Sequence, residues 1–122
     1  MGKKILIIEN EPDLVEAIQY SLEVSGYSVL ASFDGLTGLN LAKNVRPDLI
    51  ILDVHMPKLD GFHLCRMLKF DQKYEHIPII ILTGRDKEAD AKIIDDIKVD
   101  VYMNKPFEMS ALLSQVNELL GK

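Results

Sequence analysis

Five short apolar runs alternate along the chain with five segments of helical spacing, and this alternation constrains the fold more than any other feature. The runs are rich in Ile, Val and Leu with little interruption by polar residues, which is typical of parallel strands covered on both faces. They extend from Lys4 to Ile8, Ser28 to Ala31, Asp48 to Leu52, Ile77 to Leu82 and Val99 to Met103. We therefore expect five strands, each buried on both faces.

The segment after each run places apolar side chains three or four residues apart, as one face of an amphipathic helix requires. These faces are Leu14-Ala17-Ile18-Ser21-Leu22, Leu36-Leu39-Ala42, Phe62-Cys65-Leu68-Lys69, Ala89-Ile93-Ile94-Ile97 and Leu112-Leu113-Val116-Leu120. Strict alternation of strand and helix predicts an α/β, three-layer (βα)5 fold with a doubly wound parallel sheet in the strand order 2-1-3-4-5. A chain of 122 residues has the size of one domain, so we expect residues 1–122 to fold together.

Charge and cysteine usage exclude several classes of protein. Fourteen basic and nineteen acidic residues leave a net charge of −5, which disfavours nucleic acid or an anionic membrane as a direct partner. Cys65 is the only cysteine, so no intramolecular disulfide forms and a reducing compartment is expected. The apolar runs are too short to span a bilayer, and the first residues lack the features of a signal peptide. We therefore expect a cytoplasmic protein.

Polar and charged residues stand where the expected strands end. They are Glu9-Asn10-Glu11, Asp53, Thr83 and Lys105. Ligands of doubly wound sheets bind at the carboxyl ends of the strands, so we expect the side chains after the first, third, fourth and fifth strands to converge on one cleft. Carboxylates without cysteine form a hard-oxygen site that suits Mg²⁺ or Mn²⁺. A lysine and a hydroxyl group beside it would orient and neutralise a phosphoryl group.

Four short motifs occur one after another along the chain. They are Ile8-Glu9-Asn10-Glu11-Pro12, Leu52-Asp53-Val54-His55-Met56-Pro57-Lys58-Leu59-Asp60-Gly61, Thr83-Gly84 and Tyr102-Met103-Asn104-Lys105-Pro106-Phe107. With these motifs at this spacing, the chain resembles the receiver domain of a two-component response regulator over essentially all of its 122 residues.

The resemblance implies that Asp53 accepts a phosphoryl group from a sensor histidine kinase or a phosphotransfer protein, with the help of Mg²⁺ or Mn²⁺. The metal ligands of the family correspond to the Asp53 side chain, the backbone carbonyl of His55, and the pair Glu9 and Asn10. Lys105 would pair with the acceptor and phosphoryl oxygens. Such a protein is not an enzyme in the usual sense, because it catalyses only its own phosphorylation and dephosphorylation.

The resemblance also implies a switch. Thr83 would donate a hydrogen bond to the phosphoryl group, and Tyr102 would then swing inward behind it. The face formed by the fourth helix, the fifth strand and the fifth helix would carry the signal to a downstream protein target or effector domain. The peptide bond between Lys105 and Pro106 is expected to be cis.

Several positions depart from the usual pattern of the family. Asn10 carries an amide where a carboxylate is usual, so we expect weaker Mg²⁺ binding, slower phosphotransfer and slower loss of the phosphoryl group. Glu9 keeps the charge of the commoner aspartate and has a longer reach. Glu11 follows the usual pattern of the family and is expected to compensate in part for Asn10 through water. The resemblance implies that His55 and Arg85, at positions that the family uses to control the access of attacking water, influence the lifetime of the phosphoryl group. Lys98-Val99 replaces a common Gly-Ala, which predicts an irregular end to the fourth helix.

The main alternative is a pseudo-receiver, a binding module of the same fold that is not phosphorylated because Asn10 replaces a metal-ligating acid. A flavodoxin-like FMN carrier would need a loop rich in Ser, Thr and Gly after the first strand, where Glu9-Asn10-Glu11 stands. A haloacid-dehalogenase-type phosphatase would need an acid at His55. The sequence leaves open the cognate kinase, the output and a homodimer. No room follows Gly121 for an effector, so we expect a stand-alone regulator or a part of a longer protein.

Overall fold

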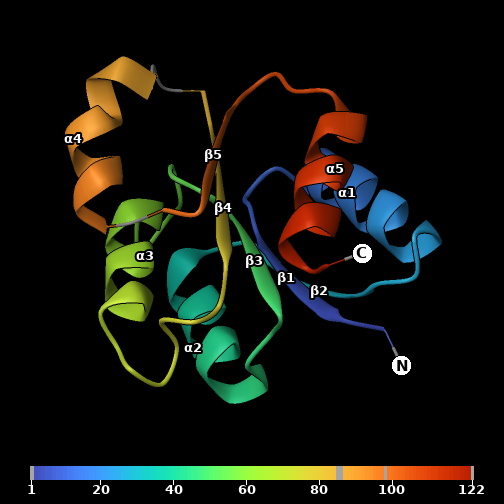
Figure 1. The fold of residues 1–122 in the computed structure, drawn as a ribbon, viewed down its shortest axis with the longest axis horizontal. Helices are drawn as coiled ribbons and strands as arrows, with labels where there is room; N and C mark the ends of the chain where they lie inside the picture. The colour runs from blue at the N-terminus through green and yellow to red at the C-terminus, as the bar shows by residue number, and fades with distance from the viewer. Residues whose placement is uncertain (1, 85–86, 98, 122) are drawn as a thin grey trace.

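The computed structural model describes residues 2–84, 87–97 and 99–121 and shows five strands alternating with five helices (Figure 1). The strands are β1 (Lys4–Ile8), β2 (Ser28–Ser32), β3 (Leu49–Asp53), β4 (Ile79–Thr83) and β5 (Val101–Asn104). The helices are α1 (Pro12–Val24), α2 (Gly35–Val45), α3 (Gly61–Lys69), α4 (Lys87–Ile97) and α5 (Met109–Leu119). The expected α/β alternation is confirmed.

All strands run parallel in the order β2-β1-β3-β4-β5, which confirms the predicted doubly wound topology. Helices α1 and α5 cover one face of the sheet, and α2, α3 and α4 cover the other (Figure 1). The register places Asp53 opposite Leu82 and Thr83 opposite Asn104. The polar residues that end β3, β4 and β5 therefore lie along the same edge of the sheet.

The core consists of two apolar clusters, one on each face of the sheet. Alternate residues of β1 serve the two clusters, because Ile5 and Ile7 pack under α1 and α5 while Leu6 and Ile8 pack under the other helices. Residues 5–8 of β1 and all residues of β3 and β4 are buried, as expected for strands covered on both faces. Cys65 belongs to the core as predicted, and burial raises the pKa of its thiol to about 12.

The expectation of complete burial is wrong for the two edge strands. In β2 only Ser32 is fully buried and Leu30 is 41% exposed, while β5 is half-buried except for the exposed Asn104. The reason is geometric, since an edge strand has a neighbour on one side only and lies near the rim of the helical layers. The apolar character of these strands predicted their existence and overstated their burial.

Three strands are also shifted toward the carboxyl end of the sheet relative to prediction. Strand β3 includes Asp53, β4 begins at Ile79 rather than Ile77, and β5 begins at Val101 rather than Val99. Pro78 has no N–H for a ladder, which explains the late start of β4. Before β5, the side chain of Asp100 accepts a hydrogen bond from the N–H of Ile79 at 2.8 Å and takes the place of a strand residue.

An ion pair between a largely buried lysine and a partly exposed aspartate closes the amino end of the sheet. The ammonium of Lys69, at the end of α3, lies 2.6 Å from Asp100 Oδ2 and is shielded from water. Lys69 also donates hydrogen bonds to the carbonyls of Ile77 at 2.8 Å and Glu75 at 3.3 Å. This group, which we call the Lys69 cluster (Lys69, Asp100 and the carbonyls of Glu75 and Ile77), joins α3 to the beginnings of β4 and β5.

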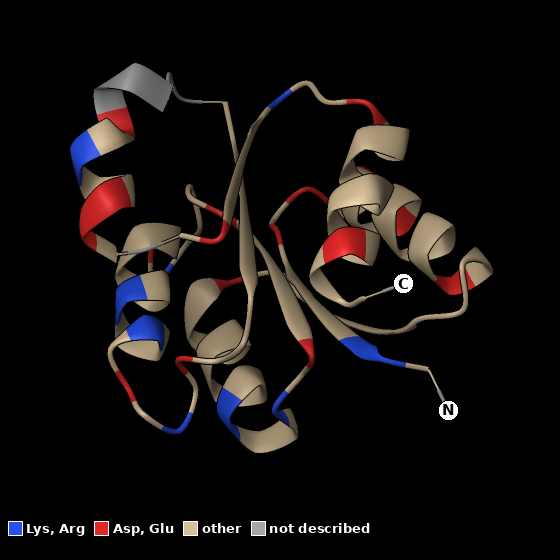
Figure 2. Ribbon diagram, viewed as in Figure 1, with Lys and Arg blue, Asp and Glu red and all other residues tan. Residues whose placement is uncertain are grey.

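Charged side chains are unevenly divided between the two helical layers (Figure 2). Helices α1 and α5 contain acidic residues and no Lys or Arg, whereas α2 and α3 contain basic residues and no Asp or Glu, and α4 carries both signs. Asp95 and Asp96 are exposed on α4, and His63 and His76 are exposed as well, all as predicted. The expected effects of Arg85 and Lys98 fall on positions outside the described residues. In the part of the chain that the structure describes, no helix combines the length and apolar character needed to cross a bilayer.

Candidate functional site

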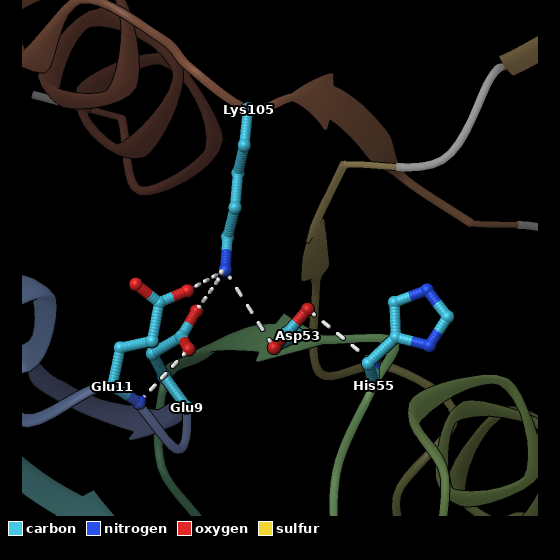
Figure 3. Close-up of polar contacts among 5 residues, drawn as sticks. All are labelled: Glu9, Glu11, Asp53, His55 and Lys105. Carbon is cyan, nitrogen blue, oxygen red and sulfur yellow. Dashed lines mark hydrogen bonds and ion pairs between the residues drawn. The ribbon is translucent and has the colours of Figure 1, made fainter.

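The predicted cleft is centred on the ammonium group of Lys105, which follows β5. Its Nζ lies 2.7 Å from Glu9 Oε1, 3.3 Å from Glu11 Oε1 and 3.6 Å from Asp53 Oδ2 (Figure 3). Glu9 and Glu11 come from the loop after β1, and Asp53 ends β3. We call these four residues the Lys105 cluster. The carboxyl ends of three strands therefore meet at one cation, as the sequence predicted for Glu9, Asp53 and Lys105.

The members of the Lys105 cluster differ in burial. Glu9 and Asp53 are buried, while the Glu11 side chain is 63% exposed. Burial raises the pKa of the Glu9 carboxyl, and the hydrogen bond from Lys105 only partly offsets this effect. Burial opposes the charge of Lys105, but the hydrogen bond and charge of Glu9, followed by the charge of Asp53, raise its pKa overall. Three carboxylates around one ammonium leave this cleft with a net charge of −2.

Backbone groups hold the two buried carboxylates in place. Glu9 Oε2 accepts a hydrogen bond from the N–H of Glu11 at 3.2 Å, and Asp53 Oδ1 accepts one from the N–H of His55 at 3.3 Å (Figure 3). The imidazole of His55 belongs to an exposed residue at the rim. Behind Asp53, a Cβ atom on Gly61 would lie 2.3 Å from the Asp53 carbonyl oxygen, so only glycine fits there. The Asp53 carboxylate therefore stands on tightly packed backbone.

Thr83 lies at the same edge of the sheet as the Lys105 cluster. It is fully buried at the end of β4, and its carbonyl accepts a hydrogen bond from the backbone N–H of Lys105 at 2.7 Å. The next peptide bond, between Lys105 and Pro106, is cis, as the resemblance implied. These contacts fix the backbone of the loop that carries Lys105 against the end of β4.

Tyr102 is directed toward α4. Its hydroxyl donates a hydrogen bond to Asp90 Oδ2 at 3.2 Å, and Asp90 is fully buried. The sequence analysis missed Asp90, although a signal was present. Asp90 lies three and four residues before Ile93 and Ile94, so helical spacing puts it beside the apolar face of α4.

Of the two neighbours Asn10 and Glu11, the structure brings Glu11 and not Asn10 into contact with Lys105. Asn10, which the family pattern offered as a metal ligand, is exposed, and its side chain makes no hydrogen bond to any described residue. Glu11 was left out of the predicted ligand set, yet it contacts Lys105. Its proximity depends on a side-chain orientation that the spacing of the motif does not encode.

The oxygen donors of the cluster are chemically suited to Mg²⁺. Glu9 and Asp53 supply carboxylates, which are hard ligands, and Mg²⁺ commonly keeps several waters in addition. Among the described residues, no group of three or more acidic, histidine or cysteine side chains is placed to hold a metal ion by itself. The donor set therefore fits a partly hydrated Mg²⁺ that uses few protein ligands.

An open groove of about 460 Å³ adjoins the Lys105 cluster between α1 and α5. It is lined by Glu11, Leu14, Lys105, Pro106, Phe107 and Met109. Apolar side chains thus lie beside the cleft that contains the Lys105 ammonium. All charged residues of the two helices, α1 and α5, are acidic (Figure 2). This combination of apolar lining and neighbouring charge is typical of surfaces that contact another protein.

Comparison with known proteins agrees with the geometry of the cleft. The sequence profile of the response regulator receiver domain matches residues 5–117. The chain is 41% identical over 122 residues to the alkaline phosphatase synthesis transcriptional regulatory protein PhoP of Bacillus subtilis, covering all of this chain and 50% of that protein. The chain thus spans about half the length of the curated relatives it matches.

Two solved structures share the fold closely. The signal receiver domain of a signal transduction histidine kinase from Syntrophus aciditrophicus superimposes with a TM-score of 0.91 at 35% identity, covering 98% of this chain and 91% of that one. The receiver domain of a sensor histidine kinase from Pseudomonas aeruginosa superimposes with a TM-score of 0.85 at 29% identity over the full length of both chains. The latter contains a magnesium ion coordinated in its active-site cleft.

Proposed function

Because the chain belongs to the response regulator receiver domain family, we propose that it transmits signals by accepting a phosphoryl group on Asp53. The observation that carries this proposal is the position of Lys105 Nζ, 3.6 Å from Asp53 Oδ2 at the carboxyl end of the sheet. A cation at this distance can neutralise an acceptor carboxylate and a phosphoryl oxygen together. We assign the receiver domain to residues 1–122 as a whole.

In the proposed reaction, a carboxylate oxygen of Asp53 attacks the phosphorus of a phosphohistidine in a kinase or a phosphotransfer protein. A phosphorus–oxygen bond forms as the phosphorus–nitrogen bond breaks, and the donor imidazole keeps the bonding electrons. The product is an acyl phosphate on Asp53. Lys105 and the hydroxyl of Thr83 stabilise the transferred oxygens. Hydrolysis later returns Asp53 and inorganic phosphate, so the protein catalyses only its own modification.

A divalent cation, Mg²⁺ or Mn²⁺, would be held by Glu9, Asp53 and the carbonyl of His55. When bound, the cation offsets the negative charge that gathers between donor and acceptor during transfer. Asn10 can offer only an amide oxygen, so we expect weaker binding than with a carboxylate at this position. The receiver domain with magnesium in its active-site cleft supports the choice of metal.

The switch is proposed to involve Thr83 and Tyr102. Once Thr83 binds the phosphoryl group, Tyr102 would turn inward and give up its hydrogen bond to Asp90 on α4. The phosphoryl group adds roughly two negative charges and three acceptor oxygens, which is enough to bias a side chain between two positions. The face of α4, β5 and α5 would then bind an effector domain or a separate protein.

The test is phosphorylation by acetyl phosphate in the presence of Mg²⁺, followed by intact mass measurement. We expect one phosphoryl adduct in the wild type and none in Asp53→Ala or after addition of EDTA. Asp95→Ala, which removes an exposed acid on α4, is the matched control and should be modified normally.

The pseudo-receiver remains the second candidate because Asn10 is uncharged and exposed. It predicts a folded protein that forms no adduct and does not bind Mg²⁺. In that case Asn10→Asp should introduce metal binding, because it restores the carboxylate that the family uses at this position.

A further inference from the structure

Glu11 lies where it can replace the charge that Asn10 lacks. We propose that Glu11 is the third acidic group of the metal site and binds the hydrated cation through a water molecule. This inference rests on the proposed function, since it concerns the same cation. It assigns to Glu11 a positioning role that the motif of the family gives to its neighbour.

The orientation of Glu11 is the first observation behind the proposal. Glu11 occupies the N-cap position of α1, and its side chain accepts no hydrogen bond from the first turn of that helix. Its carboxylate reaches across the cleft to Lys105 Nζ at 3.3 Å (Figure 3). The described side-chain contact of Glu11 is therefore made in the site and not with its own helix.

The second observation is that these carboxylates already surround one positive group, the ammonium of Lys105. One ammonium contacts Glu9, Glu11 and Asp53 together, so all three lie within the span of a single positive group and its hydration shell. The backbone of Glu11 is held to the same set, because its N–H donates to Glu9 Oε2. Glu11 is therefore fixed near the cleft through its backbone as well as its side chain.

The exposure of Glu11 favours an interaction through water rather than direct coordination. Its side chain is 63% exposed, whereas Glu9 is buried. A carboxylate at the solvent side of the cleft can accept hydrogen bonds from the waters that Mg²⁺ retains. Glu11 need not abandon Lys105 to do so, since a carboxylate has several acceptor positions.

Charge balance points the same way. With Glu11 included, the Lys105 cluster carries a net charge of −2, which matches a divalent cation. Without Glu11, only Glu9 and Asp53 would oppose Lys105, and the net charge would be −1. An aspartate at position 10 would restore the missing charge, but this chain has Asn10 there.

The experiment measures Mn²⁺ affinity by the electron paramagnetic resonance signal of the free ion, with Mg²⁺ added in competition. Glu11→Gln should weaken Mn²⁺ binding about tenfold, as expected for one charge acting on a divalent ion across a water layer. Glu11→Asp should retain most of the affinity. Glu23→Gln, an exposed acid in the last turn of α1, controls for net charge and should change the affinity less than twofold.

A double-mutant cycle with Asn10→Asp gives the sharper test. In that background a direct carboxylate is available, so Glu11→Gln should weaken binding by less than about threefold. An equal loss in both backgrounds would overturn the proposal, because Glu11 would then act as an ordinary nearby charge. Unchanged affinity in Glu11→Gln would also overturn it.

The proposed function can be separated from this inference. Wild-type protein that forms the Asp53 adduct while Glu11→Gln binds Mn²⁺ normally would refute the role of Glu11 alone. Wild-type protein that neither binds Mn²⁺ nor forms an adduct would refute both.

Discussion

Two lysines with little solvent exposure stand at opposite ends of the sheet, and their surroundings differ in one respect. Lys69 is bound by one carboxylate and two backbone carbonyls, so its charge is matched and its donors are used. Lys105 faces three carboxylates, so its surroundings carry more negative charge than it can neutralise. The Lys69 cluster joins elements of the fold, whereas the Lys105 cluster carries negative charge that its own lysine does not neutralise.

The comparison extends to the acids. Asp100 pairs with Lys69 and also accepts the N–H of Ile79, so it serves a strand as well as an ion. Glu9 and Asp53 also accept backbone N–H groups, but these belong to loops that form the cleft. Similar bonding therefore stabilises the sheet at one end and orients the carboxylates of the cleft at the other.

Breaking the Lys69 cluster should give the largest loss of stability. We expect Lys69→Met to lower the free energy of unfolding by about 3 kcal/mol, because Asp100 and two carbonyls would lose a buried partner. Urea denaturation measures the change, and Lys92→Met on the exposed face of α4 is the control. Mn²⁺ affinity should stay unchanged. A loss equal to that of the control would show that the cluster is not structural.

Breaking the Lys105 cluster should cost less at neutral pH. Lys105→Met leaves three carboxylates together, and we expect a loss of about 1–2 kcal/mol, moderated by the exposure of Glu11. Mg²⁺ should recover part of this stability in the variant. The measurement is urea denaturation with and without Mg²⁺, and recovery by NaCl of equal ionic strength would contradict the specific role of the divalent ion.

Mg²⁺ itself should stabilise the wild type at the carboxyl end of the sheet. At ten times the dissociation constant, binding to the folded state adds about 1.4 kcal/mol and raises the melting temperature by several degrees. Asp53→Ala should lose most of this shift, while Lys69→Met should keep it. Differential scanning fluorimetry provides the measurement, and an equal shift in wild type and Asp53→Ala would argue against metal binding at Asp53.

The smallest effect concerns pH. Burial holds the pKa of Glu9 above its ordinary value of 4.5, so the folded state binds this proton more tightly than the unfolded state does. The corresponding stability is present below pH 4.5 and is lost as the pH rises through the folded-state pKa. Glu9→Gln should therefore reduce the fall in unfolding free energy as the pH rises above 4.5.

Denaturation at a series of pH values tests this effect. Glu23→Gln, which removes an exposed acid, should leave the slope as it is in the wild type. An equal or larger fall in unfolding free energy above pH 4.5 in Glu9→Gln than in the wild type would contradict the raised pKa of Glu9.

The difference between the two lysines also shows what the sequence could predict. Strand order and the meeting of Glu9, Asp53 and Lys105 follow from the alternation of apolar runs and from where each run ends. The partners of Lys69 could not be foreseen, since they include backbone carbonyls of a loop after α3. The side-chain contacts of Glu11 and Tyr102 could not be predicted for a related reason. Their partners, Lys105 and Asp90, come from other elements of the fold.

Two glycines allow close packing around the loop that follows Asp53. A Cβ on Gly61 would press on the carbonyl of Asp53, and a Cβ on Gly35 would lie 1.9 Å from the carbonyl oxygen of Leu59. The loop between β3 and α3 is therefore closely packed at both glycines, where a larger residue would not fit. Among the described residues, a Cβ on Gly84, just beyond Thr83, would meet nothing within 4 Å. A larger side chain is therefore excluded on the α3 side of Asp53 and is compatible with the described surroundings just after β4.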